Sequence, residues 1–132
     1  MIFNQDIKVR YVTATSFPGG VMEAHKKLHQ LVPSCPDKKY FGLSRPENGA
    51  IIYRAAAEDP GFVETAGLED DIIVLKKGRY VSITINDFMK DIPGIEKAFK
   101  ELLSHPGLDP NGYCVEWYIN DTDVKCMIRL NE

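Results

Sequence analysis

The sequence predicts an α+β fold, in which duplicated strand-helix-strand-strand units form an antiparallel sheet with two helices on one face and a central ligand groove. Segments that alternate apolar and polar residues indicate strands, and two segments with apolar residues at helical spacing indicate helices. The order of these elements over about residues 5–58 recurs over about 71–130, within a length of 132 residues that suits a single domain, 1–132. Such a repeat predicts a pseudo-two-fold molecule, and the junction of two halves is a common place for a ligand.

The first expected strand covers residues 6–17, where apolar and polar residues alternate. Residues 18–32 are expected to form a helix, because their apolar residues share one face, and Pro33 ends it. The residues on that face are Val21, Ala24, Leu28, Leu31 and Val32.

Two further strands are expected over residues 38–45 and 50–56. Between them lies Asn48-Gly49, a pair typical of a type I′ hairpin turn. The stretch 58–71, rich in Pro, Gly and acidic residues, is the longest expected loop.

The second half begins with a strand-like segment, 72–86, that contains a turn at Lys77-Gly78. The tripeptide RYV in this segment, at residues 79–81, also occurs in the first strand at residues 10–12. Residues 91–103 are expected to form a helix with Pro93 near its start. Its apolar stripe consists of Ile92, Ile95, Phe99, Leu102 and Leu103.

The last two strands are expected over residues 113–120 and 124–130, joined by a polar turn. A tight antiparallel hairpin would pair Ile119 with Val124, Trp117 with Cys126, and Glu116 with Met127. Because side chains alternate across a strand, this register places Trp117 on the apolar face that packs against the helices. It places Cys114 and Cys126 on opposite faces, which disfavours a disulfide between them.

Glu116 is unusual in the middle of a strand, since a buried polar group without a hydrogen bond costs roughly 2–7 kcal/mol. Either it faces water, or it has a partner in the protein or in a ligand. An exposed pair with Lys125 or Arg129 would contribute about 0–1 kcal/mol. The alternative is an aromatic-walled groove on the face away from the helices, whose carboxylate attracts a cationic or polar aromatic molecule. The residues expected on that face are Tyr11, Tyr80, Glu116, Tyr118 and Met127.

Composition excludes several classes of function. The net charge is −3, and without a basic run the chain lacks the surface expected of a nucleic-acid-binding protein. Three cysteines without CxxC spacing do not predict a disulfide framework or a zinc site. His25 and His29, spaced i, i+4, would suit a metal, but no third ligand is evident nearby. With no signal peptide and no transmembrane segment in the sequence, we expect a cytoplasmic protein.

Three segments carry a resemblance to a known family: KKYFGLSRPENGAIIYRAA (38–56), KKGRYVSITIN (76–86) and GYCVEWYINDTDVKCMIRL (112–130). They resemble the GyrI-like (gyrase-inhibitory-protein-like) small-molecule-binding domain, which is also the effector-binding domain of some AraC-type and MerR-type regulators. The resemblance spans roughly residues 5–130, and Glu116 followed by Tyr118 is its most specific part. No helix-turn-helix precedes the domain, so direct DNA binding is not expected.

The resemblance implies two strand-helix-strand-strand units around a groove, with Glu116 on its floor in contact with a cationic or planar heteroaromatic ligand. We expect no cofactor and no metal. The expected ligand-binding residues are Tyr11, Phe41, Tyr53, Tyr80, Glu116, Trp117, Tyr118 and Met127. An oligomer through an edge strand is possible.

Two other functions remain open at this point. Some stand-alone members of the family are hydrolases that open strained, cyclopropane-containing toxic compounds, which would make Glu116 a water-activating base and Tyr118 or Tyr80 an orienting hydroxyl. The third function is a protein-interaction or inhibitor module that acts through the acidic stretch 58–71.

Overall fold

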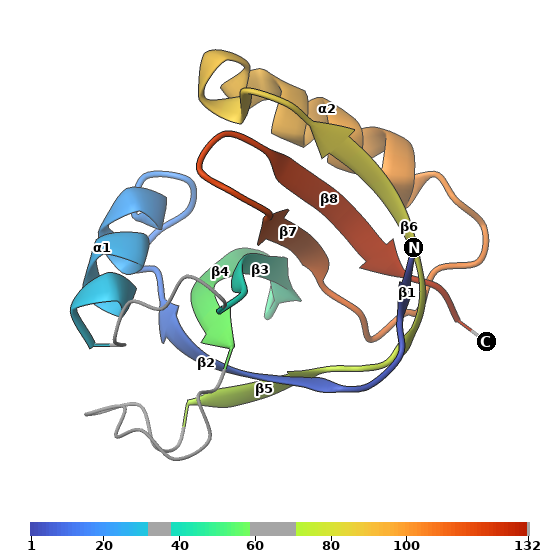
Figure 1. Ribbon diagram of the computed structural model, residues 1–132, viewed down its shortest axis with the longest axis horizontal. Helices are drawn as coiled ribbons and strands as arrows, with labels where there is room; N and C mark the ends of the chain where they lie inside the picture. The colour runs from blue at the N-terminus through green and yellow to red at the C-terminus, as the bar shows by residue number, and fades with distance from the viewer. Residues whose placement is uncertain (32–37, 59–70, 132) are drawn as a thin grey trace.

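The computed structural model describes residues 1–31, 38–58 and 71–131. In these ranges eight antiparallel strands form one curled sheet of order β1-β6-β8-β7-β3-β4-β2-β5, with two α-helices on its convex face (Figure 1). The predicted α+β class, with both helices on one face of an antiparallel sheet, is therefore confirmed. Val32, Pro33, Cys35 and most of the stretch 58–71 lie outside the described residues.

The strands are β1 (Ile2–Phe3), β2 (Ile7–Thr13), β3 (Tyr40–Glu47), β4 (Ala50–Glu58), β5 (Ile72–Leu75), β6 (Gly78–Ile85), β7 (Cys114–Tyr118) and β8 (Val124–Arg129). The helices are α1 (Val21–Leu31), the short 3-10 helix η1 (Phe88–Lys90) and α2 (Ile92–Leu103). Strands β2, β4 and β3 lie side by side, as do β6, β8 and β7, and the two sets meet where β3 pairs with β7. This order fits two similar halves, although an internal duplication stays a prediction.

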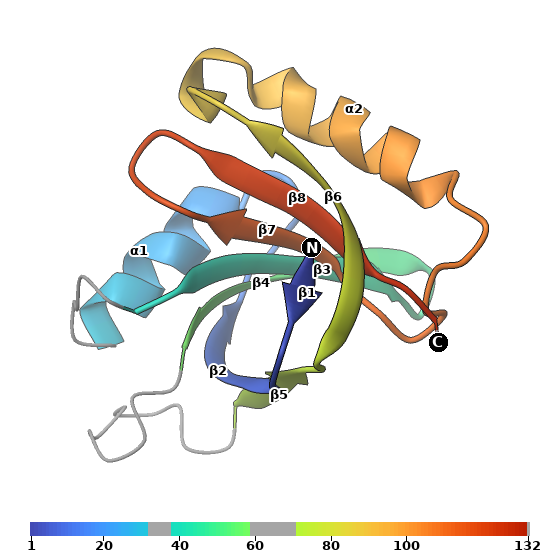
Figure 2. The same cartoon turned by 45° about the vertical axis from the view of Figure 1, so that its right-hand side comes forward.

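The turns agree with their sequence signals. Asn48 and Gly49 have φ values of 53° and 83°, as a type I′ turn requires, and Glu47 faces Ala50 across it. The expected turn at Lys77-Gly78 separates β5 from β6, which pair with different neighbours. The N-terminal strand β1, which the pattern of the sequence does not predict, pairs with β6 (Figure 2).

Each helix covers one half of the convex face. Ala24 and Leu28 of α1 are buried against β2 and β4, and Ala98 and Leu102 of α2 are buried against β6 and β8. The predicted stripe of α2 is partly wrong, because Ile92 and Leu103 are 52% and 56% exposed. Leu103 follows the buried Leu102 by one position, which is more than a quarter of a helical turn.

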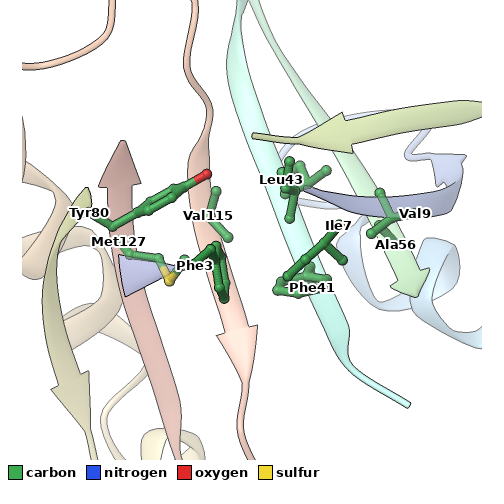
Figure 3. Packing of buried hydrophobic residues seen from close by; sticks show 10 residues of the cluster. Phe3, Ile7, Val9, Phe41, Leu43, Ala56, Tyr80, Val115 and Met127 are labelled. Atoms are coloured by element: carbon green, nitrogen blue, oxygen red, sulfur yellow. The ribbon is translucent and has the colours of Figure 1, made fainter. Parts of the chain in front are cut away.

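The concave face holds a separate apolar cluster (Figure 3). The curl brings side chains from β6, β7 and β8 opposite those from β2, β3 and β4, and Phe3 of β1 lies among them. The buried members are Phe3, Ile7, Val9, Phe41, Leu43, Ala56, Leu75, Tyr80, Val115 and Met127. The face away from the helices is thus largely filled by the chain itself.

The predicted register of the last hairpin is wrong by one residue. Glu116 faces Cys126 and Tyr118 faces Val124, because the loop between the strands takes in Ile119. A shift of one residue moves every side chain of one strand to the other face relative to its partner. Glu116 therefore lies on the face covered by the helices, and Trp117 lies on the concave face.

Candidate functional site

Four polar side chains meet on the convex face of the sheet. Glu116 and Tyr118 come from β7 and Tyr53 from β4, all at positions of the strand pleat that face the helices. His25 comes from α1, one residue after the buried Ala24. Tyr53 packs in the cluster under α1, and Tyr118 packs in the cluster under α2, so the site lies where these clusters meet.

A single oxygen of Glu116 accepts both tyrosine hydrogen bonds. The hydroxyl of Tyr118 lies 2.5 Å from Oε1 and that of Tyr53 lies 3.1 Å from it. The other oxygen, Oε2, accepts no hydrogen bond from the described residues and is not among their buried unpartnered atoms. This second oxygen is therefore the position at which the carboxylate can accept a further hydrogen bond.

His25 extends the network by one step, because its Nε2 lies 2.8 Å from the hydroxyl of Tyr53. When Tyr53 donates its only proton to Glu116, the histidine must donate to Tyr53, which selects the tautomer protonated at Nε2. Burial, and secondarily the charge of His29, lowers the pKa of His25 from 6.5 to about 4. A neutral histidine is therefore joined through Tyr53 to the carboxylate.

The carboxylate is electrostatically unfavourable in this place. Burial raises the pKa of Glu116, and the bonds from Tyr118 and Tyr53 lower it by less. No basic side chain among the described residues contributes to the shift in the pKa of Glu116. Burial and the charge of Glu116 raise the pKa of both tyrosine hydroxyls, so both remain hydrogen-bond donors.

Further aromatic rings pack against the two tyrosines that bind the carboxylate. The ring of Phe17 stacks on Tyr53 at 5.9 Å, and the ring of Phe88, from η1, lies 5.6 Å from Tyr118. His25 contacts Tyr118 edge to face at 5.3 Å. Phe17 is 46% exposed, so part of this aromatic lining reaches the surface.

Gly42 of β3 makes room for the carboxylate. It lies opposite Glu116 in the β3–β7 ladder, and the hydroxyl of Tyr53 lies directly over its backbone. A Cβ at this position would lie 2.8 Å from Oε1 of Glu116 and would overlap the Tyr53 ring. The glycine thus lets the two side chains meet above the sheet.

The structure brings together three of the eight expected ligand-binding residues, Tyr53, Glu116 and Tyr118. The other five lie on the concave face: Tyr11, Phe41, Tyr80, Trp117 and Met127. The expected place of Tyr11, Tyr80 and Met127 beside Glu116 is wrong, since the slipped hairpin register put Glu116 on their face. The predicted face of Trp117, against the helices, is also wrong because of that register. For the same reason, Cys114 and Cys126 share a face rather than lying on opposite ones, and both are free thiols.

The concave-face residues have other contacts. The hydroxyl of Tyr80 donates to the Lys76 carbonyl oxygen at 2.7 Å, which removes Tyr80 as an orienting hydroxyl for Glu116. The guanidinium of Arg54 lies 5.3 Å from the Tyr11 ring.

The expected surface pairing of Glu116 with a basic residue is also wrong. The ammonium of Lys125 lies over the ring of Trp117 on the other face. Arg129 pairs with Asp109 and donates to the Lys77 carbonyl oxygen. Glu116 is held by neutral hydroxyls instead.

Three members of the site were not expected from the sequence, namely His25, Phe17 and Phe88. His25 had a usable signal, because it lies three residues before Leu28 and four after Val21, at the margin of the apolar face of α1. Phe17 lies in a turn and Phe88 begins the three-residue helix η1, and periodicity carries no information about side-chain direction in segments this short.

The described residues contain no group of three or more His, Cys, Asp or Glu side chains arranged to hold a metal ion. Their helices are also too short or too polar to cross a lipid bilayer.

Comparison with known proteins identifies the fold. No family model and no curated protein matches the chain. Among solved structures, an integron cassette protein from the mobile metagenome of Vibrio cholerae is 13% identical, with a TM-score of 0.68 over 99% of this chain and 94% of that one. A hydrolase from Listeria innocua is 12% identical, with a TM-score of 0.50 over 99% of this chain and 89% of that one. At these identities the likeness extends to the fold alone.

Proposed function

We propose that the protein is a small-molecule-binding domain of the GyrI-like type and that it binds a planar organic cation at Glu116. The observation that carries this proposal is the carboxylate itself, which lies among aromatic rings and is held by two neutral hydroxyls on one oxygen. A cationic ligand would supply the positive partner that the described protein residues do not provide.

The surroundings fit a flat cation. Tyr118, Phe88 and Phe17 present aromatic rings, whose faces attract positive charge, at the margin of the carboxylate. Oε2 of Glu116 is free to accept a hydrogen bond or an ion pair while Oε1 stays fixed by the tyrosines. Tyr53 and Tyr118 thereby orient the charge before the ligand arrives.

The test compares N-methylphenanthridinium with phenanthridine, which has the same ring system but is neutral at pH 7. We expect calorimetry to show saturable binding of the cation and at least tenfold weaker binding of the neutral ring. Glu116→Gln should weaken binding of the cation at least tenfold, because removing one partner of a buried charge pair costs about 2 kcal/mol or more. It should change binding of the neutral ring little.

Glu101→Gln, an exposed change on α2 with the same loss of charge, is the matched control.

Glu116→Gln should not lose stability at pH 7. A glutamate whose pKa is raised on folding contributes stability below its unfolded pKa, and that stability is lost as the pH rises through the folded pKa. Equal affinity of a well-folded Glu116→Gln variant for the cation would overturn the proposal.

Binding should also depend on pH in a defined direction. The cation needs the ionised carboxylate, so affinity should fall as the pH decreases through the raised pKa of Glu116. Protonation of His25, whose pKa is about 4, adds a repelling charge at the acidic end of the same range. Calorimetric titrations between pH 4 and pH 8 would measure this decline, and an affinity that rose on acidification would contradict it.

A hydrolase at the same site is the second candidate, and one observation favours it. Glu116 combines a raised pKa, suited to a general base, with one oxygen that accepts no hydrogen bond from the described residues. Tyr118 would orient the substrate. A cyclopropane-containing heteroaromatic compound would then give a product heavier by one water molecule, detected by mass spectrometry. Glu116→Gln should abolish that product while the compound still binds, whereas a pure binding protein forms none.

The third candidate, an interaction module acting through the acidic stretch 58–71, rests on a segment that lies mostly outside the described residues. It stays a prediction from the sequence. Replacing Glu64, Glu69 and Asp70 by Gln, Gln and Asn should impair such a module, whereas Glu116→Gln should not.

A further inference from the structure

The concave side of the sheet contains a hollow of about 660 Å³, on the face opposite to Glu116. Its size is within the range of small-molecule sites. It lies between the N-terminal segment 1–8 and the ends of β3, β4, β7 and β8. The side chains that matter for its chemistry are Phe3, Lys39, Trp117 and Lys125.

Aromatic side chains form one wall of this hollow. The indole ring of Trp117 lies 5.9 Å from the ring of Phe3 and 6.3 Å from that of Phe41. Phe3 and Phe41 are buried beneath it, whereas Trp117 is only partly buried and lines the space. A planar ring placed in the hollow would therefore find an aromatic surface.

Two partly buried lysines flank Trp117. Lys125 lies directly opposite it on β8, with Nζ 5.5 Å from the centre of the indole ring. Lys39 lies two residues before Phe41, which faces Trp117 across the β3–β7 ladder. Among the described residues, no ion pair joins either ammonium group to a carboxylate.

The acidic residues that line the hollow are held by backbone amides. Glu58 accepts a hydrogen bond from the Lys39 amide at 3.2 Å, and Asp6 accepts one from the Lys77 amide at 2.8 Å. The carboxylates of Glu58 and Asp6 thus already accept hydrogen bonds, whereas the ammonium groups of Lys39 and Lys125 form no ion pair with the described residues. Charge complementarity at these two ammonium groups favours an anion.

We infer that this hollow is a second ligand site, which binds a planar aromatic carboxylate. The ring of the ligand lies against Trp117, and its carboxylate is placed between Lys39 and Lys125. This site is distinct from the Glu116 site in position and in the sign of the charge that it selects.

The test uses 2-naphthoate, with 2-naphthamide as a neutral ligand of the same shape. Calorimetry should show saturable binding of 2-naphthoate and roughly tenfold weaker binding of the amide, as expected for the loss of one charged contact. Trp117 is the single tryptophan of the chain, so one indole N–H signal in a ¹H–¹⁵N spectrum reports on the site. That signal should shift on addition of 2-naphthoate.

Lys125→Met removes the ammonium group and keeps most of the stem, and it should weaken binding of 2-naphthoate about tenfold. Lys97→Met, an exposed change on α2 with the same loss of charge, should leave that binding unchanged. Should Lys125→Met unfold, the unsubstituted protein still provides a test, because added salt should weaken binding of 2-naphthoate but not of 2-naphthamide.

Three results would overturn the inference. The first is equal binding of the acid and the amide, and the second is an indole signal that does not move at saturation. The third is competition between 2-naphthoate and N-methylphenanthridinium, together with loss of 2-naphthoate binding in Glu116→Gln, which would place the anion at the other site.

Discussion

Glu116 occupies a position that disfavours its own charge. Burial raises its pKa more than the two tyrosine hydroxyls lower it, so a neutral side chain would suit the fold better. Residues that violate local packing rules in this way are often functional. The tyrosines and His25 then hold the carboxylate in one orientation through Oε1, and Oε2 accepts no hydrogen bond from the described residues.

Gly42 provides a test of this arrangement. Gly42→Ala places a methyl group against the hydroxyl of Tyr53 and within 2.8 Å of Oε1 of Glu116, which forces the site apart. We expect a loss of about 1–3 kcal/mol in the free energy of unfolding, measured with urea, as for overpacked cores. The folded Gly42→Ala protein should also bind N-methylphenanthridinium more weakly than the unsubstituted protein.

Gly107→Ala is the matched control, because its added methyl group would lie at ordinary contact distances from His105, at 3.4 Å, and Leu130, at 4.0 Å. We expect its stability to stay within about 0.5 kcal/mol of that of the unsubstituted protein. Equal effects of the two substitutions would mean that the space above Gly42 is not needed for the site.

Single residues differ in how far the sequence predicts their role. A carboxylate inside an aromatic strand marks Glu116, and side-chain alternation then brings Tyr118 to the same face. Tyr53 and His25 join the site only because β4 and α1 pack beside β7, which no local pattern specifies. Tyr80 and Trp117 carry the same aromatic signal as Tyr118, yet they face the concave cluster.

At the level of elements, most strands and both helices follow from periodicity, because each covers one apolar face. The hairpin of β7 and β8 is the exception. One of its faces carries Val115 and Met127, and the other carries Val124, Cys126 and Ile128, so both are apolar and both are packed. Alternation fixes a register only where one face is polar, and here two registers fit the pattern equally well.

Hydrogen bonds of Asn120 in the loop between β7 and β8 help to select the register found in the structure. The side-chain oxygen of Asn120 accepts hydrogen bonds from the backbone amides of Thr122 and Asp123, at 2.8 and 2.9 Å. Its amide nitrogen donates to Asp123 at 3.1 Å. Asparagine side chains that bond to the backbone two or three residues later commonly shape turns in this way.

Asn120→Ala should therefore lower the free energy of unfolding by about 1–2 kcal/mol, since two backbone amides lose their partner. Asp121→Ala, which alters the exposed neighbouring residue in the same loop, should change it by less than about 0.5 kcal/mol. Urea unfolding followed by circular dichroism measures both. If the two variants unfolded alike, the Asn120 contacts would not contribute to the hairpin.

For the whole molecule, the curl of the sheet decides what each face can do. The convex face carries helices and leaves the Glu116 cluster between their packing regions, whereas the concave face closes on its own apolar side chains (Figures 1 and 3). The groove was expected on the face away from the helices because Glu116 and several aromatic residues were assigned to that face. The curl depends on contacts between distant strands and on β1, which are not visible in local patterns.

Strand β1 has only two residues, and they make a final test of how the concave cluster is closed. Phe3 is 8% exposed and contacts Tyr80 at 5.1 Å between ring centres, whereas Ile2 is 60% exposed. Phe3→Ala should lower the free energy of unfolding by about 3 kcal/mol, because it leaves a cavity among aromatic rings. It should also change the fluorescence of Trp117, whose ring lies 5.9 Å away.

Ile2→Ala is the control, and it should change neither the free energy of unfolding nor the Trp117 fluorescence by a measurable amount, since its side chain is largely exposed. Similar losses from both substitutions would show that backbone pairing of β1 with β6, rather than the Phe3 ring, closes the concave side.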